Sequence, residues 1–118
     1  MIAWNGDDPG ARAVKAAMPL LRKAKNIVVV TSERSLNKKP NQQDLKRYLG
    51  LHNIEVECIS FKEGRIKTPQ AILAHAEQFH ADLIVAGALA HKKKHQQMLG
   101  GVTRRLLSKT NVPLFMVS

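Results

Sequence analysis

The segment with the clearest chemical character covers residues 87–103 and reads GALAHKKKHQQMLGGVT. A glycine follows an apolar run, a basic stretch comes next, and the pair Gly100-Gly101 opens a helical pattern. Glycines let backbone N–H groups approach an anion closely, and the positive end of a helix favours negative charge. The segment therefore predicts a phosphate site in which lysines 92–94 either act as point charges or remain solvated.

Other reactive side chains are too isolated to predict a catalytic or metal site. Cys58 is the only cysteine, and no histidine or basic residue stands beside it to favour a thiolate. His91 and His95 are four residues apart without a neighbouring carboxylate or cysteine, so we expect no metal site. The chain also lacks a GxSxG nucleophile turn and a GxxxxGKS/T phosphate loop. We expect a binding protein and not an enzyme in the ordinary sense, with slow nucleotide hydrolysis left open.

Apolar runs alternate with helical patterns along the whole chain, which is typical of an α/β fold. Strands are expected at residues 2–4, 27–31, 54–61, 83–86 and 112–117. Helices are expected from Asp8-Pro9, around Leu45, from Thr68-Pro69 and from about Gly101, with Asp8 and Thr68 as N-caps before prolines. The residues from 87 to 98 are expected to form a polar loop.

These elements predict one domain of 118 residues with an open, five-stranded parallel sheet and helices on both faces. The third strand alternates polar and apolar residues, which indicates an edge and favours the strand order 3-2-1-4-5 over 2-1-3-4-5. In this order the winding reverses between strands 1 and 4, where ligands bind at the carboxyl ends of the strands. Residues 5–7 and 87–91 should therefore line a crevice.

The chain resembles the universal stress proteins over essentially its whole length. The resemblance is carried by AWNG after strand 1, HADLIVAGALAH around strand 4, LGGVTRRLL at the last helix and NVPLFMV at the last strand. In ATP-binding members, a G-x2-G-x9-G-S/T motif holds the ribose and phosphates, and an aspartate ending strand 1 lies beside the adenine. The resemblance implies a stress-response protein whose cofactor-binding residues are Ala3, Asn5, Ser32, Ala86, Gly87, Ala90, His91, Gly100, Gly101, Val102 and Thr103.

Three positions depart from the ATP-binding pattern: the second glycine is Ala90, the hydroxyl position is Gly101, and Asn5 replaces the aspartate. Alanine in a left-handed conformation costs roughly 1 to 2 kcal/mol, and the missing hydroxyl removes a hydrogen bond worth roughly 0.5 to 1.5 kcal/mol. Together these losses weaken binding by about ten- to a few hundred-fold. Asn5 keeps a donor and an acceptor but gives up the charge that would hold a metal ion. ATP could therefore still bind, through a degraded motif.

The charge of the chain leaves a second class of function open. There are 19 Lys and Arg against 9 Asp and Glu, a net charge of +10, and the last acidic residue is Asp82. Such an excess attracts any polyanion in a salt-dependent way. However, most of the few aromatic residues fall inside predicted elements, so no stacking platform for nucleic acid emerges. The alternatives to nucleotide binding are nonspecific nucleic-acid binding and a protein-interaction scaffold that needs no nucleotide.

The last strand is the expected partner surface, because it would leave an unpaired edge in a monomer. The resemblance implies a homodimer, or pairing with a tandem domain, through Val112 to Val117, and the LGGVT form is similar to second halves of tandem members. No apolar run approaches the roughly 18 to 20 residues of a membrane span, and no signal-peptide pattern is visible. We expect a cytoplasmic protein without a membrane segment.

Overall fold

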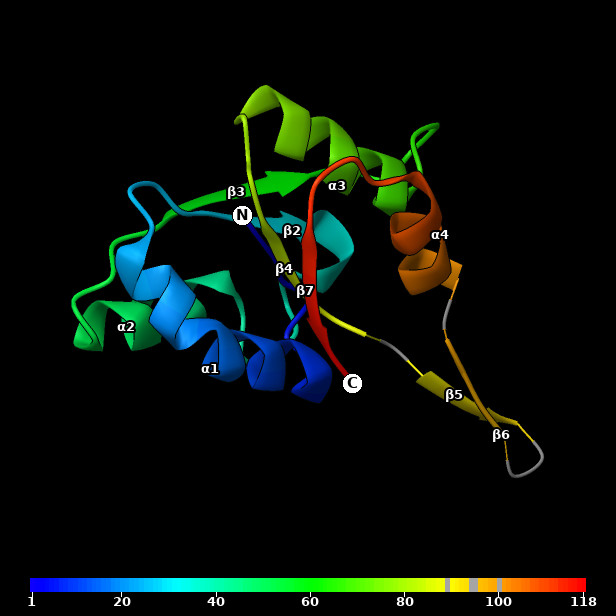
Figure 1. The fold of residues 1–118 in the computed structure, drawn as a ribbon, viewed down its shortest axis with the longest axis horizontal. Helices are drawn as coiled ribbons and strands as arrows, with labels where there is room; N and C mark the ends of the chain where they lie inside the picture. Colours follow the sequence, from blue (N-terminus) through cyan, green and yellow to red (C-terminus); the bar gives the residue numbers. More distant parts are fainter. Residues whose placement is uncertain (89, 94–95, 100) are drawn as a thin grey trace.

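The computed structural model of the chain describes residues 1–88 and 101–118, and the backbone of residues 90–93 and 96–99. Five parallel strands form the main sheet in the order β3-β2-β1-β4-β7, which confirms the predicted order 3-2-1-4-5 (Figure 1). The strands are β1 (Ile2–Ala3), β2 (Val28–Ser32), β3 (Glu57–Phe61), β4 (Ile84–Gly87) and β7 (Leu114–Val117). Strand β3 lies at an edge, as its alternation predicted, although Ile54 and Val56 are buried just ahead of it.

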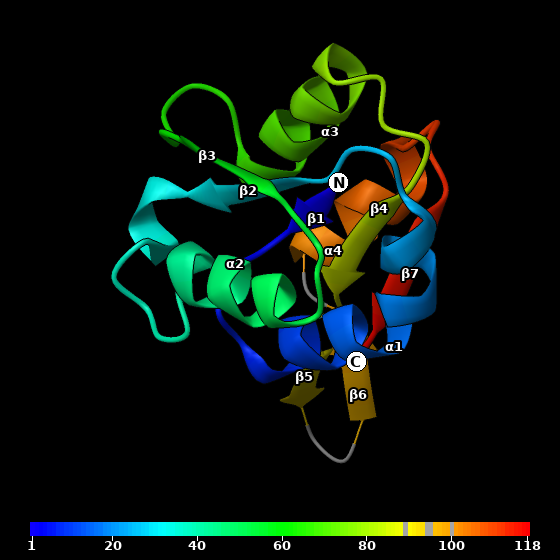
Figure 2. The same cartoon turned by 90° about the vertical axis from the view of Figure 1, so that its left-hand side faces the viewer.

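Two helices cover each face of this sheet, which confirms the predicted α/β architecture (Figures 1 and 2). Helices α1 (Asp8–Lys23) and α2 (Gln42–Leu51) lie on one face, and α3 (Thr68–Gln78) and α4 (Gly101–Lys109) lie on the other. Because strand side chains alternate between faces, each layer has its own apolar core. None of the helices in the described part of the chain is long and apolar enough to cross a membrane.

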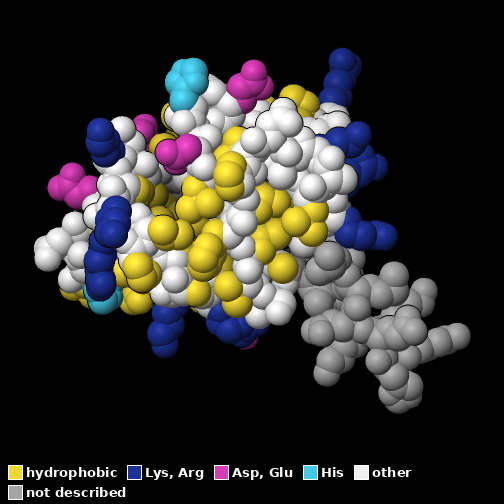
Figure 3. Space-filling view, in the orientation of Figure 1, with side chains coloured by type: hydrophobic (Ala, Val, Ile, Leu, Met, Phe, Trp, Pro, Cys, Tyr) yellow, Lys and Arg dark blue, Asp and Glu magenta, His cyan; other side chains and the backbone are white. Residues whose placement is uncertain are grey.

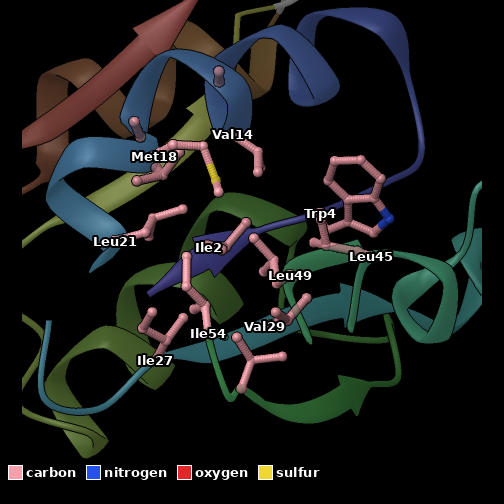
Figure 4. Close-up of a cluster of buried hydrophobic side chains, with 14 residues drawn as sticks. Ile2, Trp4, Val14, Met18, Leu21, Ile27, Val29, Leu45, Leu49 and Ile54 are labelled. Atoms are coloured by element: carbon pink, nitrogen blue, oxygen red, sulfur yellow. The ribbon is translucent and has the colours of Figure 1, made fainter. Parts of the chain in front are cut away.

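The α1/α2 layer is centred on the short strand β1 (Figure 4). Ile2 is fully buried and pairs in register with Val29 of β2 and Val85 of β4. Leu49 of α2 and Val14 of α1 pack in the same cluster. Two strand residues suffice for β1 because both of its neighbours supply ladder partners and large apolar side chains.

The helix starts differ in detail from the predicted caps. Asp7, and not Asp8, caps α1, and its side chain accepts a hydrogen bond from the Gly10 N–H at 2.8 Å. Thr68 already belongs to the first turn of α3, and its hydroxyl donates to Glu63 instead of capping the helix. Adjacent candidate caps are hard to separate in a sequence, since the choice depends on which side chain reaches the free N–H groups.

The predicted polar loop at residues 87–98 is wrong. After β4 the chain forms an antiparallel hairpin of β5 (Ala90–Lys93) and β6 (Gln96–Leu99), which projects away from the main sheet (Figure 1). Its ladder joins Ala90 to Leu99 and Lys93 to Gln96. The hydrogen bonds between β5 and β6 satisfy the backbone groups of this polar segment. The prediction missed these strands because it relied on hydrophobic periodicity, which the segment lacks.

Candidate functional site

A cavity of about 200 Å³ opens at the carboxyl ends of the central strands, on the face covered by α3 and α4. It lies where the winding reverses between β1 and β4, the position at which open α/β sheets bind ligands. We call this cavity the crevice. Its walls are Ala3, Trp4, Asn5, Val30, Ser32, Ser35, Phe61, Glu63, Thr68, Ile72, Ala86, Gly87, Val102, Thr103 and Leu106.

The structure brings seven of the eleven predicted binding residues together around the crevice: Ala3, Asn5, Ser32, Ala86, Gly87, Val102 and Thr103. Gly101 begins α4 but is not part of the wall. Ala90 and His91 are the first two residues of strand β5 in the hairpin. Gly100 lies outside the described residues.

Gly87 has a packing function that the sequence does not reveal. A Cβ atom built on it would lie 2.4 Å from the Gly10 nitrogen and 2.6 Å from the Pro9 carbonyl carbon. Only glycine therefore lets the first turn of α1 pack against the end of β4. Position 101 is different, because a Cβ there would meet no atom of the described residues within 4 Å. None of these residues would therefore block the missing hydroxyl of the motif at Gly101.

Asn5 forms the turn that leads from β1 into α1. Its Oδ1 atom accepts a hydrogen bond from the Asp7 N–H at 3.1 Å, and Gly6 follows with a φ of 80°. This Asx-turn uses one of the two lone pairs of Oδ1, so Asn5 keeps its NH₂ donors and one acceptor position for a ligand.

Among the described residues, Glu63 is the one charged residue of the crevice wall, and sequence analysis missed it. It follows β3, its side chain is only 15% exposed, and its Oε2 atom pairs with Arg34. Its Oε1 atom accepts hydrogen bonds from the Ser32 hydroxyl at 2.7 Å and from the Thr68 hydroxyl at 2.5 Å. The available signal was an acidic residue two positions after a strand, at the edge of the sheet where the crevice forms.

The two ends of the crevice differ in charge. Helix α4 has nine residues and no acidic side chain in its first turn, so the positive end of its dipole makes this end attractive to anions. The opposite end carries the Glu63 carboxylate. Within the described residues, no group of three or more His, Cys, Asp or Glu side chains could hold a metal ion.

A second cavity of about 330 Å³ lies between α1 and α2 on the other face of the sheet. Its wall is mostly apolar, and neither Ser32 nor the start of α4 reaches it. Its polar residues, Lys15, Asp44 and Tyr48, form little of its surface, so the crevice, where polar groups from several elements converge, is the better candidate site. The second cavity is lined by Trp4, Ala11, Val14, Lys15, Pro40, Asp44, Leu45 and Tyr48.

Known structures share this fold. A universal stress protein from Archaeoglobus fulgidus superposes with a TM-score of 0.82 at 20% identity, over 99% of this chain and 96% of its own. A second one, from Archaeoglobus fulgidus DSM 4304, gives 0.77 at 19% identity over 99% of this chain and 44% of its own. A hypothetical protein whose biochemical function was assigned from its structure gives 0.60 at 22% identity, over 98% and 93%.

Sequence comparison identifies the family. Among curated protein sequences, no relative matches this chain. The model of the universal stress protein family matches residues 28–118, which include β2, β4, α4 and all of the crevice wall except its β1 part. This protein therefore belongs to the universal stress protein family.

Proposed function

We propose that this protein binds an adenine nucleotide in the crevice and acts in the stress response through binding, without catalysis. The observation that carries the proposal is the convergence of Asn5, Ser32, Gly87 and Thr103 on one cavity. These residues come from the turn after β1 and from β2, β4 and α4, and they meet at the switch point of the sheet. An arrangement of this kind is what nucleotide sites in open α/β folds have in common.

The start of α4 is the part of the crevice that suits phosphate. Val102 and Thr103 line the cavity from the first turn of this helix, where the positive end of the helix dipole favours anions. Phe61 and Ile72 supply apolar walls near the other end, against which a base can stack. The proposed orientation therefore puts the phosphates at α4 and the base toward β2 and β3.

Titration calorimetry with Mg-ATP tests the proposal. We expect saturable heat for the wild type and at least about ten-fold weaker binding for Val102→Glu, because the added carboxylate would face the phosphates. Leu107→Glu is the matched control, since it adds the same charge on α4 at a side chain that is 51% exposed. It should bind ATP like the wild type.

The same instrument separates this proposal from the nucleic-acid alternative. Duplex DNA should be titrated in parallel over a series of salt concentrations, because affinity for a polyanion falls steeply with salt. DNA binding without saturable ATP heat would contradict the proposal and support a nonspecific polyanion binder. The absence of both signals would instead favour a protein-interaction scaffold.

We also propose that β7 pairs with a second copy or with a tandem domain. Strand β7 pairs with β4 along one edge, and within the described residues no strand covers its other edge. Its four residues are only partly buried, and hydrophobic side chains gather on the face where β7 lies (Figures 1 and 3). Sedimentation at micromolar concentrations should detect a dimer, which Phe115→Lys should dissociate. A purely monomeric wild type would overturn this part of the proposal.

A further inference from the structure

Glu63 is the only acidic residue among those that line the crevice, and the function proposed above does not use it. In the sheet order, β3 and β2 lie on one side of β1, whereas β4 lies on the other. Glu63 follows β3, and its hydrogen-bond partner Ser32 ends β2. The carboxylate is therefore at the crevice end to which the proposed orientation brings the base.

The contacts of this carboxylate show which of its oxygens can take a ligand. A carboxylate has about four acceptor sites. Two on Oε1 are used by the hydroxyls of Ser32 and Thr68, and one on Oε2 is used by Arg34. Because the Arg34 side chain is 78% exposed, this ion pair is weak and easily exchanged. The Oε2 atom thus has acceptor capacity for a hydrogen-bond donor.

We infer that Glu63 recognises the 6-amino group of a purine and so makes the crevice selective for adenine nucleotides. The inference rests on the proposed function. A carboxylate repels phosphate, so the negative groups of the ligand turn toward α4 and the base turns toward Glu63. An ionised carboxylate only accepts hydrogen bonds, which suits a 6-amino group and opposes the oxygen of a 6-oxo purine.

The test compares ATP, ITP and 2′-deoxy-ATP as ligands of the full chain by titration calorimetry. We expect the wild type to bind ATP about ten- to a hundred-fold more tightly than ITP. This ratio corresponds to the free energy of one hydrogen bond to a charged group. In Glu63→Gln the ratio should fall to about two-fold or less, because an amide can also donate to a 6-oxo group. The matched control is Glu33→Gln, which removes an exposed charge nearby but not from the crevice wall. It should keep the wild-type ratio.

Each outcome separates this inference from the proposed function. If the wild type binds ATP and ITP equally, or if Glu63→Gln keeps the preference, the inference fails while nucleotide binding stands. If Glu63→Gln changes the ratio of ATP to 2′-deoxy-ATP and not the ratio of ATP to ITP, the carboxylate contacts the ribose and the inference is again overturned. If no nucleotide binds the wild type, both fail together.

A second variant keeps the inference testable if Glu63→Gln is poorly folded. Arg34→Ala leaves the carboxylate in place and removes only its exposed partner. It should keep or increase the preference for ATP over ITP, because an additional acceptor site becomes free. Loss of the preference in this variant, with an unchanged unfolding midpoint, would contradict recognition by Glu63.

Discussion

The two faces of the sheet are built from the same strands but differ in the size of their side chains at the carboxyl end. On the α1/α2 face, Ile2 and Val85 are 0% and 1% exposed and belong to a tightly packed core. Their neighbours along the same strands, Ala3 and Ala86, face the crevice. One strand position thus separates a large residue that fills its layer from a small residue that leaves space. In β1 and β4, the space of the crevice therefore arises from small side chains at alternating strand positions.

The largest expected effect comes from the packed face. Leu49→Ala should lower the free energy of unfolding by about 2 to 5 kcal/mol, because Leu49 is fully buried and its truncation leaves a cavity. Urea unfolding gives the value, and ATP affinity measured on the folded variant should not change. Leu51→Ala on the same helix is the control, since Leu51 is 80% exposed and should change stability by less than about 0.5 kcal/mol. If Leu49→Ala changed the ATP affinity, packing on the α1/α2 face would influence the crevice on the opposite face.

A change at Gly87 should affect both faces of the sheet, because this residue lines the crevice and also contacts α1. Gly87→Ala should lower the free energy of unfolding by about 1 to 3 kcal/mol, since the new Cβ would overlap the backbone at Gly10. It should weaken ATP binding as well, by changing the crevice wall. The control is Gly50→Ala, where an added Cβ meets no atom within 4 Å and helix propensity predicts a small gain in stability. Equal stabilities of the two variants would contradict the close approach.

A smaller and opposite effect is expected at the start of α4. Gly101→Ser should tighten ATP binding by about two- to ten-fold, because it supplies the missing hydroxyl where no described residue would clash with the new Cβ. Calorimetry measures the affinity, and the urea midpoint should stay close to that of the wild type. An unchanged affinity would mean that position 101 does not face the phosphates.

The smallest effect concerns Cys58, which is partly buried against the α1/α2 core. Burial raises the pKa of this thiol, opposed by the nearby charge of Lys46. We therefore expect iodoacetamide to modify Cys58 more slowly at pH 8 than it modifies a thiol in an unfolded chain. Since the folded pKa is the higher one, stability should fall as the pH rises above the unfolded value. Saturating ATP should leave the rate of modification unchanged, because the crevice is on the opposite face.

The arrangement of the sheet could be predicted because each strand carries its own signal. Alternation in residues 54–61 predicted the edge position of the third strand, which the observed strand order confirms. The position of the crevice followed from the strand order alone. The hairpin could not be predicted, because its strands carry no apolar alternation and only the geometry of pairing defines them.

The chemistry of the crevice was less accessible from the sequence. The contact between Gly87 and α1 joins segments nearly eighty residues apart, so no local pattern encodes it. The importance of Glu63 depends on the adjacency of β2 and β3, which brings Ser32 within hydrogen-bond distance. Both features are properties of tertiary structure. A glycine or a glutamate after a strand would, by residue type alone, be expected in an ordinary surface loop.

The composition of the crevice wall has a consequence for how occupancy can be observed. Ala3, Ala86 and Val102 come from the beginning, the middle and the end of the chain, so the wall exists only when all of these elements are docked. A molecule bound there would hold the first strand and the last helix of the fold together and would have no site on an unfolded chain. Its binding energy would be added to the stability of the whole protein, about 2.7 kcal/mol at a hundred times its dissociation constant. Thermal melting would then serve as a simple screen for what this protein holds in the cell.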